Sequence, residues 1–390
     1  MTILLPTLDG RVEPYRLQNP DAPYANFTPR PFNRIAYAAA HVVVDPNRPA
    51  DPWDETVAID WDKTLGFREY LWGLGFKVAE AMDTAQRGMG LGWKDSAELI
   101  RRSIAHARNF PGADLSCGVG TDQLQVTPNT TLEDVLRAYR EQFEVVDEAG
   151  GSAILMASRA LCAVAKGAED YQKVYSTLLG EARQKVVLHW LGEAFDANLR
   201  GYWGSTDVPT AMATVLSIIE ANVDKVDGIK ISLLEAKWEE ELRRRLPAGV
   251  KLYTGDDFNF GELIAGDSEH HSHALLGIFD PIAPVAAHAL AALADGDTDR
   301  YHTLMNPTVA LSREIFRAPT RYYKAGVVLL AWLNGHQDHF SMLGGMQSAR
   351  SLSHYAEVFR LADKAGVLIR PDLAVQRMKQ LAAVCGGISG

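Results

Sequence analysis

The sequence of 390 residues predicts an α/β fold, a (β/α)8 or TIM barrel with an N-terminal arm and a C-terminal helical region. Short apolar segments near residues 35, 76, 114, 153, 186, 226, 250 and 274 have strand length, and helix-length segments separate most of them. Strands that alternate with helices form parallel βα units. Near-continuously apolar strands are covered on both faces of their sheet. Eight such units in about 260 residues fit a closed barrel better than an open sheet.

The chain divides into three expected parts. Residues 1–34 are rich in proline and show no clear period, which indicates an arm that packs on the body of the protein or on a neighbouring subunit. Residues 35–295 carry the alternating strands and helices of the barrel. From residue 296 to 390 strand signals cease while helical stripes continue, so this part is predicted to be a helical region.

The first βα units are clear in the pattern. Residues 35–44 form an apolar strand that Asp45-Pro46 ends. Residues 62–74 then carry apolar side chains at steps of three and four, which is one face of a helix. Gly75 ends this helix, and residues 76–82 form the second strand.

The later units repeat this order. Residues 114–120 are a strand that runs into a glycine turn, and Thr130 with Glu133 is typical of a capping box at the start of a helix. The remaining expected strands cover residues 153–157, 185–191, 226–231, 250–254 and 274–279.

An open doubly wound sheet is the alternative fold, and it would carry a dinucleotide-binding fingerprint after its first strand. Gly88, Gly90 and Gly92 have the spacing GxGxG, and Gly118-Val-Gly120 lacks the third glycine of the fingerprint. The barrel is therefore the better prediction.

Composition narrows the class of function. The formal net charge is −10 and the pI is about 5.6, so nucleic acid and anionic membranes are excluded as main partners. Three cysteines without a CxxC motif favour a reduced, cytoplasmic compartment. The N-terminus lacks the features of a signal peptide, and no run of 18 apolar residues predicts a membrane span.

The active site of a (β/α)8 barrel is built from the C-terminal ends of its strands. Lys230 closes the apolar segment 226–231, where loss of solvent can make its amine nucleophilic. The alternative is an ordinary strand-terminal lysine with its head in water. Many of the other polar residues at strand ends could equally cap the next helix. They are Asp45, Glu80, Asp83, Thr84, Thr121, Asp122, Ser158, Arg159, His189, Glu193, Ser232, Asp256, Asp257 and Asp280.

A metal site is a second interpretation. Glu80, Asp83, His189 and Glu193 offer the oxygen and imidazole ligands that suit manganese, magnesium or zinc. No ligand-spacing motif such as HExxH supports such a site. We therefore expect no cofactor, with a divalent metal as the alternative.

Two short segments carry a family resemblance. Gly228-Ile229-Lys230 and, further on, Gly255-Asp256-Asp257 resemble the dihydrodipicolinate synthase / N-acetylneuraminate lyase family of class I aldolases. Val119-Gly120 is similar to the family's turn after strand three, and residues 295–333 are similar to its C-terminal helices. The resemblance implies that Lys230 forms a Schiff base, that the substrate is a small carbonyl compound, and that the protein is a homo-oligomer, either a dimer or a tetramer.

The chain also departs from the family pattern. Of the two threonines that the family has after strand two, only Thr84 is matched, because Ala85 takes the second place. The family's tyrosine after strand four is missing from Ser158-Arg159-Ala160-Leu161, and its arginine after strand five is missing from residues 189–195. Ser232 stands where many members have a glutamate. The sequence therefore indicates a divergent branch with a different substrate.

The sequence favours a Schiff-base lyase or aldolase that acts on a small keto acid or a sugar-derived carbonyl compound through Lys230. We expect His189, with a pKa near neutrality, or Glu193 to transfer protons, and Arg159 to bind an anionic group. The alternatives are a metal-dependent isomerase, epimerase or hydrolase and a non-catalytic metabolite-binding barrel. The predicted substrate-binding residues are Thr84, Asp83, Gly120, Ser158, Arg159, Ser232, Asp256, Asp257 and Asp280.

Overall fold

A closed barrel of parallel strands forms the centre of the computed structural model, which describes residues 1–48 and 57–387. The order around the barrel follows the chain, and the last strand pairs with the first. This confirms the predicted fold class. The strands are β3 (Ala36–Ala39), β4 (Lys77–Glu80), β5 (Leu115–Val119), β6 (Ser152–Leu155), β7 (Val186–Leu191), β8 (Val226–Ser232), β9 (Lys251–Thr254) and β10 (His273–Leu276).

The strands lie at the predicted positions in the chain, and their observed ends differ by a few residues from the predicted ends. The expected strand 35–44 is a strand only over Ala36–Ala39, and the buried residues after it form a loop that contains His41. The expected capping box lies one residue further along, where Thr131 and Asp134 cap each other's backbone N–H groups.

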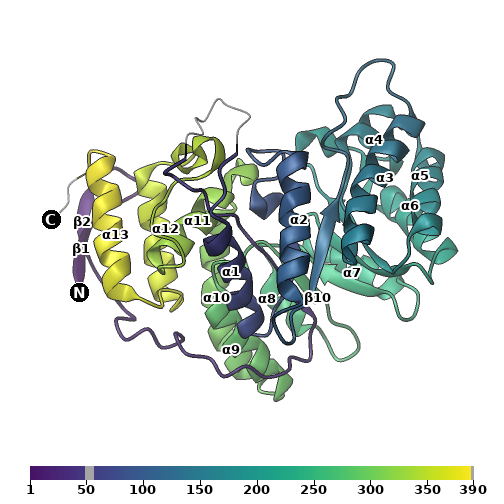
Figure 1. The fold of residues 1–390 in the computed structure, drawn as a ribbon. Helices are drawn as coiled ribbons and strands as arrows, with labels where there is room; N and C mark the ends of the chain where they lie inside the picture. Colours follow the sequence, from purple (N-terminus) through teal and green to yellow (C-terminus); the bar gives the residue numbers. More distant parts are fainter. Residues whose placement is uncertain (49–56, 388–390) are drawn as a thin grey trace.

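Helices follow the strands and cover the outside of the barrel (Figure 1). The apolar faces of these helices pack on the strands, as the helical stripes in the sequence predict. They are α1 (Trp61–Gly73), α2 (Trp93–Ala107), α3 (Leu132–Ala149), α5 (Ala168–Glu181), α6 (Val208–Ala221), α7 (Ala236–Arg245), α8 (Phe260–Ala265) and α9 (Ala283–Ala294), with the short α4 (Arg159–Val164) before α5.

The C-terminal helices gather on one side of the barrel (Figure 1). They are α10 (Thr298–Ile315), α11 (Lys324–Leu333), α12 (Leu352–Lys364) and α13 (Pro371–Val384). Helix α10 lies against α9 and α12, and α11 contacts α13. The predicted C-terminal helices are therefore present. The segment between α10 and α11 runs over the mouth of the barrel, where it lines a cavity with residues from the strand ends.

The N-terminal arm contains a hairpin that its proline content concealed. Strands β1 (Thr2–Pro6) and β2 (Val12–Arg16) pair antiparallel, and the hairpin lies beside α12 (Figure 1). The Asp363 carboxylate accepts hydrogen bonds from Tyr15 Oη at 2.7 Å and from the Gln18 backbone at 2.7 Å. The arm therefore packs on the C-terminal helices of its own chain.

One cluster of buried apolar side chains runs through all three parts of the chain. It includes Ile3 in the arm, Leu276 in the barrel and Phe359 in the C-terminal region. Whether the segments 1–34, 35–295 and 296–390 are separate domains stays a prediction. Within the described residues, every helix is too short or too polar to cross a membrane.

Candidate active site

Lys230 lies near the C-terminal end of β8, where strand pairing places it beside His189 of β7 and Tyr253 of β9. The lysine side chain is 8% exposed. It passes over Gly255, at which a Cβ atom would lie 2.6 Å from Lys230 Cε. The glycine after β9 therefore leaves the space that the lysine side chain occupies.

The surroundings of Lys230 favour its neutral amine. Burial lowers the pKa of Lys230 below 10.5, although the charges of Asp257 and Asp83 act in the opposite direction. Within residues 1–48 and 57–387, no carboxylate oxygen lies within 4.0 Å of its Nζ atom. The amine is thus held in place by packing and is free to react.

Asp257 is the carboxyl group that acts most strongly on Lys230. Its Oδ1 accepts a hydrogen bond from the Ile278 backbone N–H at 3.1 Å. Burial raises the pKa of Asp257 to about 7, and the charge of Lys230 acts against this rise. A carboxyl group and an amine whose pKa values are shifted toward each other can exchange a proton near neutrality.

His189 is fully buried, and neither of its ring nitrogens has a hydrogen-bond partner among the described residues. Burial, followed by the charge of Lys230, lowers its pKa well below 6.5. The expectation of a histidine that titrates near neutrality is therefore wrong. The neutral ring can accept a hydrogen bond from a bound molecule. Unpartnered buried polar groups of this kind are often functional.

Thr84 is positioned by a residue that the sequence analysis did not select. Its Oγ1 atom lies 2.8 Å from the hydroxyl group of Tyr323, which immediately precedes α11. The Tyr323 ring stacks on Phe316 with centroids 4.2 Å apart and an interplanar angle of 13°. Burial raises the pKa of Tyr323 well above 10, and the charge of Asp83 adds to this effect. The phenol therefore keeps its proton at neutral pH and can donate a hydrogen bond.

Two neighbouring cavities open at these strand ends. The larger has a volume of about 610 Å³ and lies between the strand ends and residues 319–324. The smaller has a volume of about 210 Å³, and His189 and Gly120 are in its wall. Both are lined by Asp83, Arg87, Gly88, Arg159, Leu191 and Asp196.

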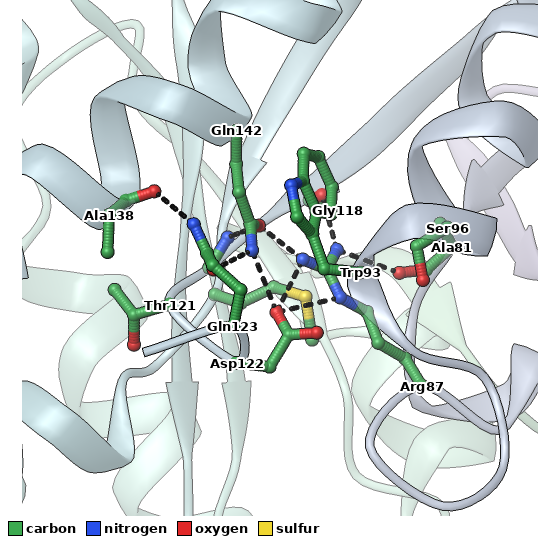
Figure 2. Close-up of polar contacts among 12 residues, drawn as sticks. Ala81, Arg87, Trp93, Ser96, Gly118, Thr121, Asp122, Gln123, Ala138 and Gln142 are labelled. Atoms are coloured by element: carbon green, nitrogen blue, oxygen red, sulfur yellow. Dashed lines mark hydrogen bonds and ion pairs between the residues drawn. The ribbon is translucent and has the colours of Figure 1, made fainter. Parts of the chain in front are cut away.

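Arg87 holds the ends of two strands together at the wall of both cavities (Figure 2). Its Nη1 donates to the Gly118 carbonyl at 2.6 Å, and its Nη2 lies 2.6 Å from Asp122 Oδ1. Burial is the largest single effect on Asp122 and works against its ionisation, but the charge of Arg87 and the hydrogen bonds from Arg87 and Gln142 together lower the pKa of that carboxyl group. Gln142 contacts Arg87 and accepts the Gly120 N–H at 2.6 Å, so this network fixes the turn after β5.

Several predicted substrate-binding residues have structural partners. Ser158 caps α4 and shares a hydrogen bond of 2.6 Å with Thr121. The Asp256 carboxylate accepts backbone N–H groups of the following turn, at 2.8 Å and 3.0 Å. Asp280 Oδ2 lies 2.7 Å from Nδ1 of His41. Ser232 is buried at the end of β8, next to Gly255.

The four-residue metal site is a wrong prediction, because two of its members lie elsewhere. Glu80 forms a buried two-pronged ion pair with Arg68, with both N–O distances 2.9 Å. The Glu193 side chain is 64% exposed and lies 3.7 Å from Arg200. In the described part of the chain, no group of three or more histidine, cysteine or acidic residues could hold a metal ion.

The structure thus brings together Lys230, Asp257, Asp83, His189 and Thr84 at the strand ends, and it adds Tyr323 and Lys324 from the C-terminal region. Asp83 is central because its charge acts on Lys230, Tyr323 and Lys324. In the sequence, Tyr323 and Lys324 differ from other polar residues only in directly preceding a strongly apolar segment.

Solved structures of the dihydrodipicolinate synthase family share this fold. YagE, a prophage protein of that family from E. coli K12 solved in complex with pyruvate, matches with a TM-score of 0.66 and 13% identity, over 86% of this chain and 99% of its own. Dihydrodipicolinate synthase from Aquifex aeolicus matches with a TM-score of 0.63 and 11% identity, over the same shares.

A third structure, the chloride-inhibited dihydrodipicolinate synthase from Acinetobacter baumannii complexed with pyruvate, matches with a TM-score of 0.61 and 14% identity, over 86% of this chain and 99% of its own. The resemblance predicted from the short segments is thereby confirmed as a likeness of fold. The comparison with curated proteins finds no match. A family model covers residues 3–387, and the chain belongs to that family, described as "Protein of unknown function (DUF993)".

Proposed function

We propose that the protein is a Schiff-base lyase or aldolase whose Lys230 forms an imine with a small keto acid or a sugar-derived carbonyl compound. The observation that carries this proposal is the position of Lys230 at the mouth of the barrel. Its amine is buried, burial lowers its pKa, and no described carboxylate pairs with it. The likeness of fold to proteins solved with pyruvate supports a carbonyl substrate.

In the first step the neutral Lys230 amine attacks the carbonyl carbon. A C–N bond forms, the C=O π electrons move to oxygen, and the oxygen takes a proton. The Tyr323 phenol, which is kept protonated by burial, is the proton donor in this proposal. The nitrogen loses its extra proton to Asp257, whose pKa of about 7 suits a base at neutral pH.

In the second step the carbinolamine loses its hydroxyl group as water, with the proton supplied from Asp257, and the protonated imine remains on Lys230. The positive nitrogen then accepts the electrons of the bond between the α- and β-carbons, which breaks to leave an enamine on Lys230 and forms again in the reverse direction. During cleavage the β-hydroxyl group of the substrate becomes a carbonyl group and returns its proton to Tyr323. The enamine takes a proton from water, and hydrolysis of the imine releases the product and Lys230. His189 borders the smaller cavity as a neutral ring, and there it accepts a hydrogen bond from the substrate.

Trapping the imine tests the proposal. Borohydride added in the presence of pyruvate, longer keto acids or sugar acids is expected to add the substrate's mass to the peptide that contains Lys230. Lys230→Met abolishes this addition, whereas Lys237→Met, at an exposed lysine paired with Glu235, leaves it unchanged. Peptide mapping is essential because Lys324, a second buried lysine, lines the larger cavity and could be modified as well. An unmodified Lys230 with all three classes of carbonyl compound contradicts the proposal.

A further inference from the structure

A second buried lysine lies at the mouth of the barrel. Lys324 is the first residue of α11, is 4% exposed and lines the cavity of about 610 Å³. Its Nζ donates to the Arg321 carbonyl at 3.1 Å and lies 3.4 Å from the sulfur of Met89. In the ranges 1–48 and 57–387, no carboxylate lies within 4.0 Å of this ammonium group.

Two partly buried lysines elsewhere in the chain, by contrast, have counterions. Lys251 Nζ lies 2.5 Å from Asp227, and Lys77 is paired with Asp114. For Lys324, burial lowers the pKa to about 8, while the charge of Asp83 acts against this shift from beyond ion-pair distance. The group is therefore mainly protonated at pH 7. A buried ammonium without a counterion is costly unless a bound anion supplies one.

The position of Lys324 at the start of α11 also disfavours its positive charge. The first turn of a helix carries a partial positive charge, which favours anions and disfavours a cation such as Lys324. No side chain caps the start of α11. An anion bound here would satisfy both the helix terminus and the lysine.

The neighbouring arginines differ in whether a carboxylate already pairs with them. Arg87 is paired with Asp122 and Arg159 with Asp196, so their charges are compensated. The expectation that Arg159 supplies the anion site is therefore weakened. Arg321 also lines the cavity, and no described carboxylate lies within 4.0 Å of its guanidinium, which donates to the Tyr322 hydroxyl.

We propose that Lys324 and Arg321 form a subsite for an anionic group of the substrate, a carboxylate or a phosphate, away from the carbonyl group that reacts with Lys230. The substrate class is then a carbonyl compound with a charged far end. A cavity of about 610 Å³ is large enough for such a molecule. The role of this anion as part of a substrate rests on the proposed function, but the subsite itself does not.

Titration calorimetry on the full chain tests the subsite, with inorganic phosphate and malonate as separate probes. At least one of them is expected to bind saturably, and the tighter of the two identifies the kind of anion. Lys324→Met is expected to weaken binding at least about tenfold, the loss expected for a charge-assisted hydrogen bond. Lys237→Met is the matched control and leaves binding unchanged. The proposal is overturned if neither phosphate nor malonate binds saturably, or if Lys324→Met binds the anion as tightly as the wild type does.

Two further measurements distinguish failure of the subsite from failure of the proposed function and from misfolding of the variant. Lys230→Met is expected to retain anion binding. If the wild-type protein binds the anion but no carbonyl compound is trapped on Lys230, only the proposed function is contradicted. If Lys324→Met does not fold, acylation of Lys324 in the wild-type protein at pH 8 is followed by peptide mapping. Phosphate or malonate is expected to slow this modification several-fold, and an unchanged rate with both anions overturns the subsite.

Discussion

The hydroxyl group of Tyr323 lies 2.8 Å from Oγ1 of Thr84, a hydrogen bond that joins the segment before α11 to the end of β4. Gly277, after β10, packs against both partners, because a Cβ atom there would lie 3.2 Å from Thr84 Oγ1 and from Tyr323 Cε2. Phe316 stacks on the Tyr323 ring, and the same Cβ atom at Gly277 would lie 3.2 Å from Phe316 Cζ. The C-terminal region thus supplies a phenol in a fixed position at the mouth of the barrel.

Tyr323→Phe is expected to slow imine formation at Lys230 by about 10²–10⁴-fold, the usual contribution of a positioned general acid. The ring and its stacking on Phe316 are kept, so only the proton donor and the hydrogen bond to Thr84 are lost. Thr84→Val removes the same hydrogen bond and leaves the phenol in place, so its effect is expected to be smaller. The measurement is the rate of borohydride trapping with the best carbonyl substrate.

Tyr301→Phe is a matched control for this experiment. It removes a buried phenol on α10 that donates to the Gly261 carbonyl at 2.7 Å, outside the cavities. Its expected cost is about 1 kcal/mol in the free energy of unfolding, without an effect on trapping. If the two tyrosine variants trap substrate at equal rates, Tyr323 has no role in proton transfer.

His189→Leu is expected to leave the fold as stable as before, or up to about 1–3 kcal/mol more stable, while trapping falls. The reason is that neither ring nitrogen of His189 has a partner in the described residues, so the free protein loses no hydrogen bond. Chemical denaturation measures the stability. His41→Leu is the matched buried histidine, and it should destabilise the protein because Asp280 loses its partner at 2.7 Å. Marked destabilisation by His189→Leu would show that the ring is structural.

The barrel and the place of Lys230 at a strand end could be predicted from the sequence because both depend on local order. Apolar segments at regular intervals define the strands, and parallel strands in a barrel place their C-terminal ends together. A residue at such an end, such as Lys230 or Thr84, can therefore be assigned to the site without any knowledge of distant contacts.

The remaining site residues depend on contacts that no period reveals. Tyr323 enters the mouth of the barrel from a segment after α10, and its partner Thr84 is 239 positions away. Glu80 lies at a strand end as predicted, but Arg68 on α1 neutralises it. The pKa of His189 depends on complete burial, which the residue type alone does not indicate.

Asp257→Asn is expected to change how stability depends on pH. The pKa of Asp257 is raised from 3.8 in the unfolded chain to about 7 in the folded protein, so folding favours its protonated form. Its contribution to stability is fully present below about pH 4 and is lost as the pH rises to about 7. The variant should therefore lose less stability than the wild type over this interval, by about 2–4 kcal/mol. Denaturant titrations at several pH values measure the difference, and parallel curves would contradict it.

The same substitution is expected to change the reactivity of Lys230. The negative charge of Asp257 raises the pKa of Lys230, so its removal lowers that pKa further and increases the fraction of neutral amine at neutral pH. The trapping rate in Asp257→Asn should then be lower overall, because the proton acceptor and donor of the proposed mechanism is lost, but it should reach its plateau at a lower pH than in the wild type. Asp267→Asn, at an exposed carboxylate that accepts loop N–H groups, is the control and keeps the wild-type profile.

Gly255→Ala is expected to abolish trapping by displacing Lys230. The new Cβ atom would clash most closely with Ser232 Oγ and would lie 2.6 Å from Lys230 Cε and 2.9 Å from the Ile231 carbonyl, so both side chains or the strand must move. Overpacking of this kind costs about 1–3 kcal/mol, and a nucleophile displaced by about 1 Å loses rate about 10²-fold. Gly66→Ala on α1, where a Cβ atom meets nothing within 4 Å, should stabilise the helix by about 0.5–1 kcal/mol and leave trapping intact. Wild-type trapping by Gly255→Ala would mean that the path of Lys230 over Gly255 does not govern its reaction.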